Sequence, residues 1–361
     1  MIKHLSVIRE ICILVAATAL TFTLSGCSDG SDGSQGAPGE PGQGIASVSD
    51  AKGLVIDITS VTINSAPVVN FTVKNQDGVA VSGFSESDLR FNIAKLVPGT
   101  PSKWQNYINR FSGGTMQGSQ ERLRSGYPWG TLVDNKNGTF VYTFATDITD
   151  PAANPCPGPC TDVEGNALNI SYQSGLVHRV TVQQGNSSYP LYNAIYDFIP
   201  AGGTVADARE IVKTATCNEC HNVLRIHGSR IETRLCVTCH NPGTWSAGTP
   251  NQTADFKVMI HKIHRGEFLP SVEAGTPYEI GGHDYSTVIF PFSAVALGDT
   301  RSCTKCHDGT TGASNQTAQG DNWKTQFSKQ ACGSCHDDVY FGASPDPLKP
   351  YETVSHSALS G

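Results

Sequence analysis

The chain has few basic residues and little charge of either sign. Its 361 residues include 25 lysines and arginines against 32 aspartates and glutamates, and charged residues make up only 16% of the total. Because no basic stripe is present, nucleic acid is not expected as a partner. The 37 glycines and 20 prolines indicate a loop-rich protein rather than a helical bundle. The length allows about two domains.

A long membrane-spanning run is also missing from the N-terminus. The apolar stretch from Ile11 to Leu24 is too short to cross a bilayer, and it follows a short basic start. Residues 1–26 are therefore predicted to be a signal peptide. The ending Leu24-Ser-Gly-Cys27 resembles a bacterial lipobox, which implies cleavage before Cys27 and lipid attachment to its sulfur. The alternative is an ordinary signal peptide in which Cys27 is incidental.

The rest of the chain divides into three parts by composition. Residues 27–48 are rich in Gly, Ser and Pro and are predicted to form a flexible tether. Residues 49–200 are predicted to form an antiparallel β-sandwich or split barrel, because they contain short strand-like segments separated by turn signals. These segments cover residues 54–63, 68–73, 139–144, 177–182 and 192–198. Residues 201–361 have few strand patterns and are predicted to be a loop-rich domain with short helices.

Cysteine, by contrast, is abundant, and four copies of Cys-x-x-Cys-His lie after residue 200. This is the attachment signature of c-type haem, in which two thiols bond to the porphyrin and the adjacent histidine binds the iron. An export signal agrees with this assignment, since bacteria attach haem outside the cytoplasm. We expect four covalent haems, which would supply the apolar core of this domain. The attachment cysteines are Cys217, Cys220, Cys236, Cys239, Cys303, Cys306, Cys332 and Cys335, and the proximal ligands are His221, His240, His307 and His336.

Two further cysteines, Cys156 and Cys160, lie outside these motifs. They occur in Asn-Pro-Cys-Pro-Gly-Pro-Cys, with no histidine after the second cysteine. A disulfide that closes a small loop is predicted for an exported protein. A redox-active or metal-binding pair is the alternative.

Methionine is too scarce to complete the coordination of four irons. Of three methionines, Met1 leaves with the signal peptide, so only Met116 and Met259 remain. Histidine is therefore the expected ligand on both sides of each iron, which gives lower potentials than Met/His ligation and favours electron transfer over substrate binding at iron. The distal candidates are His227, His261, His264, His356, His283 and His178.

His261 and His264 are the first choice among these candidates. Residues 256–266 read as a short helix ended by Gly266, and residues three apart share a helix face. The two imidazoles are expected to serve two neighbouring irons and so hold adjacent haems together. His227 is the third choice. His356, His283 and His178 compete for the fourth place, although Gly-Gly-His283-Asp suits a surface residue and His178 lies in a predicted strand.

Several of these segments resemble the N-terminal half of the outer-membrane decahaem c-type cytochromes of the OmcA/MtrC family. The resemblance is carried by Arg225-Ile-His-Gly228, Cys236-Val-Thr-Cys-His-Asn-Pro-Gly243, Met259-Ile-His-Lys-Ile-His264 and Cys332-Gly-Ser-Cys-His-Asp-Asp338. It implies a split β-barrel followed by a multihaem domain, held at the outer membrane by the lipid. That half has five attachment motifs in the family, so four motifs suggest a truncated or short member.

The function implied by the resemblance is extracellular respiration. Electrons would arrive from other redox cytochromes or a porin–cytochrome conduit and pass to metal oxides, soluble metals or flavins. The cell surface is the expected location, with the periplasmic face as the alternative. Two rival hypotheses remain. A multihaem reductase would need an iron with an open position, and a zinc module would not need a histidine after every cysteine pair.

Overall fold

The computed structural model describes residues 44–291, apart from 157, 159, 250 and 251, and residues 302–356. All of these belong to one unit that spans residues 43–361. The predicted signal peptide, Cys27 and most of the predicted tether lie outside the described residues. Within the described part, none of the helices has the length and apolar character needed to cross a membrane.

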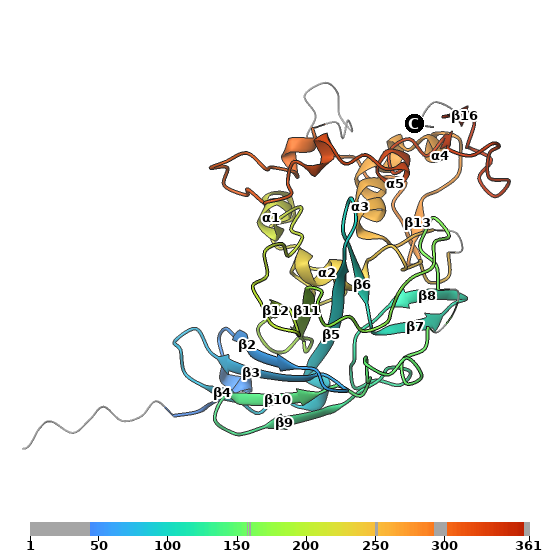
Figure 1. The fold of residues 1–361 in the computed structure, drawn as a ribbon. Helices are drawn as coiled ribbons and strands as arrows, with labels where there is room; N and C mark the ends of the chain where they lie inside the picture. Colours follow the sequence, from blue (N-terminus) through green and yellow to red (C-terminus); the bar gives the residue numbers. More distant parts are fainter. Residues whose placement is uncertain (1–43, 157, 159, 250–251, 292–301, 357–361) are drawn as a thin grey trace, which may run out of the picture. The chain divides into compact units, whose positions relative to one another are not determined.

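Two four-stranded antiparallel sheets form the β part of the chain (Figure 1). The first has the spatial order β2 (Val55–Thr62), β3 (Val68–Lys74), β10 (Thr139–Thr143) and β9 (Thr131–Asp134). The second has the order β12 (Asn193–Phe198), β11 (His178–Gln184), β5 (Leu89–Val97) and β6 (Lys103–Asn106). Turn residues end the strands as the sequence predicts. Gly138, for example, has a φ of 82° between β9 and β10.

The inner faces of these two sheets share one hydrophobic core. Along β3, buried and half-buried residues alternate, so that Val69, Phe71 and Val73 all point inward. The Phe71 ring lies 5.9 Å from Phe91 of the second sheet, measured between centroids. The predicted antiparallel β architecture is confirmed, in the form of two separate sheets packed face to face. The short helices predicted to follow it are also present.

The fold begins earlier than the predicted tether boundary at residue 48. β1 (Ala46–Ser47) pairs in parallel with β4 (Val81–Ser82), and the Ala46 amide donates to the Ala80 carbonyl over 2.8 Å. Val48 starts a 3₁₀ turn (Val48–Asp50), and its side chain belongs to the hydrophobic core. The end of the predicted tether is therefore part of the fold, because Val48 is an apolar side chain that the core accommodates.

The α-helices of the described chain all follow β12 and are short. These are α1 (Thr214–His221), α2 (Thr233–Cys239), α3 (Phe256–Arg265), α4 (Pro270–Glu273) and α5 (Lys329–Gly333). The remaining 3₁₀ turns are η2 (Glu86–Asp88), η3 (Gly266–Phe268), η4 (Cys303–Lys305) and η5 (Asn322–Lys324). The remaining strands are the hairpin β7 (Asn109–Ser112) and β8 (Thr115–Gly118), and the two-residue pairs β13 (Glu279–Ile280) with β14 (His283–Asp284) and β15 (Val339–Tyr340) with β16 (Val354–Ser355).

Helix α2 contacts the β part through a buried arginine. Arg179 of β11 makes two hydrogen bonds to the Asp197 carboxylate of β12, at 2.7 and 3.0 Å. The same guanidinium donates to the carbonyl of Arg234 in α2 over 3.1 Å, and the Arg234 side chain binds Asp197 at 2.8 Å. This network fixes the second Cys-x-x-Cys-His motif, which α2 carries, against the second sheet.

Candidate haem sites

Each Cys-x-x-Cys-His motif lies in or beside a helical turn. The motif histidine donates its backbone N–H to the carbonyl of the first cysteine over 2.8 Å at His240, 2.8 Å at His307 and 3.0 Å at His336. In the first motif, α1 itself runs through to His221. A helical turn brings residues three and four apart onto one side, so both thiols and the imidazole can address the same group. All eight cysteines are free thiols in the structure.

Three of the four motif histidines face a second imidazole. The ring centroids are 6.1 Å apart for His221 and His264, and 6.0 Å apart for His307 and His261. His240 faces His227, also at 6.1 Å. With metal–imidazole bonds of about 2 Å, and a further ~1 Å from nitrogen to ring centre on each side, two rings that share one metal ion have centroids about 6 Å apart. These three pairs therefore have the spacing that bis-histidine haem ligation requires.

Hydrogen bonds at Nδ1 suit two of these imidazoles, His240 and His264, as ligands. The Nδ1 atom of His240 lies 2.9 Å from the Ala254 carbonyl, and that of His264 lies 2.8 Å from the Ile260 carbonyl. A proton on Nδ1 leaves the Nε2 lone pair free for a metal. Burial lowers the pKa of His240 and of His261 to about 4, so both rings are neutral at physiological pH. Neutral imidazole is the form that binds iron.

Helix α3 carries two of the three facing imidazoles. The His264 ring faces His221 of the first motif and the His261 ring faces His307 of the third. That they bind two neighbouring irons stays a prediction. An ion pair between Glu219 and Lys305, 2.6 Å long, also joins these two motifs. Gly266 ends the helix with a φ of 49°, and a side chain there would collide with the Val288 carbonyl. The chain can leave the helix at this point because Gly266 has no Cβ.

The second motif lies directly against the β part. Asn92 of β5 donates to the Cys239 sulfur over 3.4 Å, and this thiol lies 3.4 Å from the Ser119 carbonyl. Gly118 of β8 lies so close to α2 that a Cβ atom would collide with the Cys239 carbonyl. The composition and motif spacing of the sequence did not reveal these β residues as neighbours of a haem site.

The fourth motif is tied to α3 by a buried ion pair. Lys262 of α3 and Asp337, the residue after His336, are 2.6 Å apart, and both side chains are buried. Ser271 donates to the same carboxylate from its amide and its hydroxyl, at 3.0 and 2.7 Å. The His336 ring is exposed, and no aromatic or imidazole ring of another described residue faces it. The structure therefore does not pair the fourth motif with a distal histidine.

The other three distal candidates lie elsewhere. His356 stacks on Phe341 at 5.2 Å and is held near the fourth motif by the β15–β16 pair. His283 is exposed in the β13–β14 hairpin, as expected for a surface residue. His178 cannot act as a ligand in this arrangement. It is fully buried in β11, and its Nε2 and Nδ1 atoms hydrogen-bond Tyr107 Oη at 2.9 Å and the Leu176 carbonyl at 2.8 Å.

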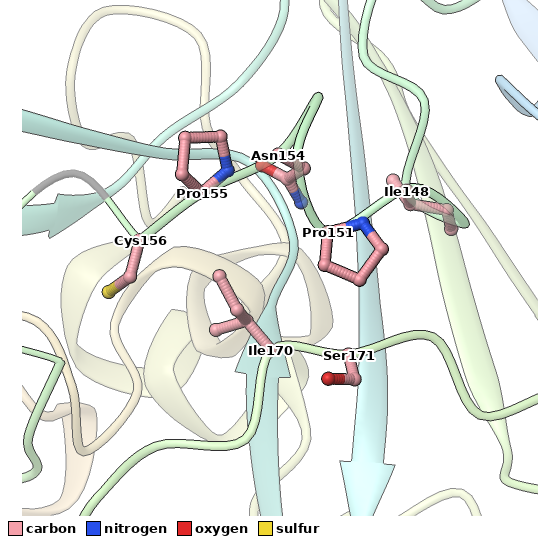
Figure 2. Close-up of a pocket in the computed structure, with 7 residues that line it drawn as sticks. All are labelled: Ile148, Pro151, Asn154, Pro155, Cys156, Ile170 and Ser171. Carbon is pink, nitrogen blue, oxygen red and sulfur yellow. The ribbon is translucent and has the colours of Figure 1, made fainter.

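The remaining cysteine pair forms a disulfide, with Cys156 and Cys160 Sγ atoms 1.99 Å apart. Cys156 also borders a small pocket of about 180 Å³, which Figure 2 shows. Its lining includes Ile148, Pro151, Ile170 and Ser171. None of the motif cysteines or histidines lines this pocket. Among the described residues, no group of three or more His, Cys, Asp or Glu side chains is placed to hold a bare metal ion.

Comparisons with known proteins agree with this arrangement. Residues 209–356 match a family model described as outer membrane cytochrome MtrC/MtrF-like, domains II/IV. The multiheme cytochrome MtrC of Shewanella baltica (strain OS185) is 29% identical over 353 residues, which are 92% of this chain and 44% of that protein.

Two solved structures are also similar. The crystal structure of the outer membrane decaheme cytochrome OmcA superposes with a TM-score of 0.66 at 25% identity, over 82% of this chain and 45% of that one. MtrC from Shewanella baltica OS185 gives a TM-score of 0.52 at 26% identity, over 80% of this chain and 40% of that one. The chain spans less than half the length of these relatives.

Fold, motifs and paired imidazoles together define a multihaem c-type cytochrome. Residues 209–356 match the MtrC/MtrF-like family model, and over most of its length the chain is similar to multihaem cytochromes of the OmcA/MtrC family.

Proposed function

We propose that this chain is an electron-transfer protein that binds four covalent c-type haems. Each haem supplies a one-electron iron couple when bound. Its thiols would come from one Cys-x-x-Cys-His motif, and the motif histidine would be one axial ligand. The observation that carries the proposal is the set of three imidazole pairs, each about 6 Å apart between ring centroids.

The residues around these pairs hold the ligands and exclude other molecules from them. Each pair would provide two imidazole ligands to the iron of a bound haem and would leave no position for a substrate at the first three motifs. The Nδ1 contacts to backbone carbonyls fix the ring orientation at His240 and His264. Because the ligands of the first and third motifs share α3, these two sites lie close together, which favours electron exchange between them.

The similarity to outer membrane cytochromes supports a proposal for the location of the protein and the direction of electron flow. We propose that the protein is anchored to the outer membrane through lipid on Cys27, at the cell surface. Electrons would arrive from other redox cytochromes or from a porin–cytochrome conduit, and extracellular metal oxides, soluble metals or flavins would accept them. The similarity to outer membrane cytochromes supports this proposal and does not favour the alternative of a reductase that acts on a small substrate at an open iron.

Carbon monoxide binding to the reduced protein tests the ligand arrangement. Carbon monoxide needs an open axial position, so the three paired sites should not bind it, and at most one haem of the four should give a difference spectrum. Binding by two or more haems would contradict the imidazole pairs. The intact mass of the exported protein, measured on the same sample, counts the haems and shows whether Cys27 carries lipid.

A further inference from the structure

Ion pairs border three of the four motifs. Glu219 of the first motif and Lys305 of the third form an ion pair of 2.6 Å. At the fourth motif, Asp337 is paired with Lys262, also at 2.6 Å. These pairs add little net charge to the haem sites that they border.

The second motif differs, because three arginines without a carboxylate partner lie beside it. Arg230 donates to the side-chain carbonyl oxygens of Gln120 and Gln183, over 2.6 and 3.3 Å. Arg90 donates to the Gly185 carbonyl over 3.4 Å. Arg122 lies over the Tyr127 ring at 3.7 Å, and its Nε is buried without a hydrogen-bond partner. We call these three residues the arginine cluster.

The fold holds the arginine cluster next to both axial histidines of the second site. Ile226 and Arg230 exchange backbone hydrogen bonds of 2.9 and 3.0 Å, which close the loop that carries His227. Arg90 lies opposite Gln183 in the β5–β11 register, and Gln183 in turn accepts from Arg230. A backbone bridge between Phe91 and Glu121 places Arg122 beside Arg90.

The nearest carboxylate in sequence does not neutralise the cluster. Glu121 points away from it and accepts hydrogen bonds from the Tyr142 hydroxyl at 2.6 Å and the Thr146 hydroxyl at 2.6 Å. Glu232, the N-cap of α2, accepts hydrogen bonds from the Thr214 hydroxyl at 2.8 Å and from the Arg234 amide at 3.1 Å.

We propose that the arginine cluster raises the reduction potential of the haem at Cys236 and Cys239 above the potentials of the other three haems. The inference rests on the proposed function, in which that haem is present. Reduction adds one negative charge to the site, and nearby positive charges in a partly buried environment stabilise the reduced form. Electrons that enter the protein then collect at the second site, beside the β part, rather than spreading evenly over four haems.

Redox titration of the four-haem protein and of Arg230→Gln tests this inference. Glutamine removes the charge and keeps a hydrogen-bonding side chain. The equilibrium constant for reduction of the second haem should fall about tenfold. The highest-potential step of the titration then moves to lower potential by about 59 mV, the equivalent value for a one-electron couple. The His227→Ala variant shows which step of the titration belongs to the second haem. That haem loses a ligand, so its step disappears from the titration of the low-spin haem signal. Arg122→Gln should lower the same step by a smaller amount.

Two controls separate charge from structure. Arg230→Lys retains the charge and should keep the potential near that of the parent protein. Lys136→Gln removes a positive charge that is paired with Asp134 in the β9–β10 turn and should leave all four steps unchanged. If Arg230→Gln and Arg122→Gln bind four low-spin haems and no step moves, or all four move equally, the inference is wrong and the proposed function stands. Absence of haem from the parent protein would refute both.

Discussion

At the scale of single residues, the same side chain has three different roles in this protein. His261 faces another imidazole at 6.0 Å, His178 is hydrogen-bonded at both nitrogens inside a sheet, and His283 is exposed on a hairpin. Of these three, only His261 faces a second imidazole at the spacing that a shared iron requires. The surroundings of each ring therefore decide its role, and these surroundings give separate predictions for each histidine.

Loss of His261 should open one haem and leave the others closed. In His261→Ala, the haem at Cys303 and Cys306 should lose its distal ligand and become high-spin, because the imidazole that faces His307 is gone. All four haems should stay covalently attached, since the thiols are unchanged. Electron paramagnetic resonance measures the spin state, and intact mass counts the haems. His283→Ala is the matched control and should leave every haem low-spin; a fully low-spin His261→Ala would remove His261 from the ligand set.

His178 should make the protein less stable in acid. Burial lowers its pKa to about 4 from an ordinary value of 6.5, so between pH 6.5 and 4 the unfolded chain takes up a proton that the folded chain does not. Stability is full above pH 6.5 and falls as the pH approaches 4, by up to about 3 kcal/mol from this residue. Urea unfolding at pH 7 and pH 4.5 measures the loss. His178→Gln should lose less stability over the same range, and equal losses would exclude His178 as the cause.

At the scale of elements, the sequence predicted five strands of the two sheets, including the central strand β11, and missed the other central strand, β5. Residues 54–63, 68–73, 139–144, 177–182 and 192–198 all contain strands, and β-branched and aromatic residues, which favour strands, are frequent in them. β5 was missed although it lies at the middle of the second sheet. Its buried residues include Asn92 and Lys95, which interrupt the apolar pattern. Both are buried because α2 and residues 171–173 provide hydrogen-bond partners that sequence periodicity does not show.

Helix α3 shows how much of the candidate site the sequence could predict. The spacing of His261 and His264 on a short helix predicted two neighbouring ligands, and the structure pairs them with the third and first motifs. The identity of those two motifs was not predictable, because it depends on loops that bring residues about 40 positions apart together. The arginine cluster was not predictable either, since its members come from β5, the segment after β8 and the loop after α1. Tertiary contacts, rather than local patterns, create it.

The junction between β11, β12 and α2 should depend on one carboxylate. Arg179 is fully buried and has Asp197 as its anionic partner, so Asp197→Asn leaves a buried positive charge unbalanced. The expected loss is roughly 3–5 kcal/mol in the free energy of unfolding. Lys136→Gln, which breaks an exposed ion pair, should cost less than about 1 kcal/mol. Chemical denaturation followed by circular dichroism measures both, and a similar small loss in the two variants would contradict the importance of this junction.

At the scale of the whole molecule, the two halves of the described chain are stabilised differently. The main hydrophobic core lies between Val48 and Phe198 and is made of side chains from both sheets. After β12, the largest cluster of buried apolar residues consists of Ala254, Leu269, Tyr278 and Ile280. Such a small cluster cannot offset the conformational entropy of some 150 residues, so we expect bound haems to supply much of the apolar surface there.

A chain that cannot bind haem should therefore keep its β part and lose the rest. Replacing all eight motif cysteines by serine prevents attachment, while the sheets retain their own core and the disulfide between Cys156 and Cys160. Limited proteolysis of this variant should leave a resistant fragment that ends between β12 and α1, at residues 199–213, whereas the four-haem protein should resist cleavage throughout α1 to α5. Mass spectrometry of the fragments locates the cut. If the haem-free chain were as resistant after residue 213 as the haem-loaded protein, side chains alone would be sufficient to hold that half together, and the porphyrins could not be its core.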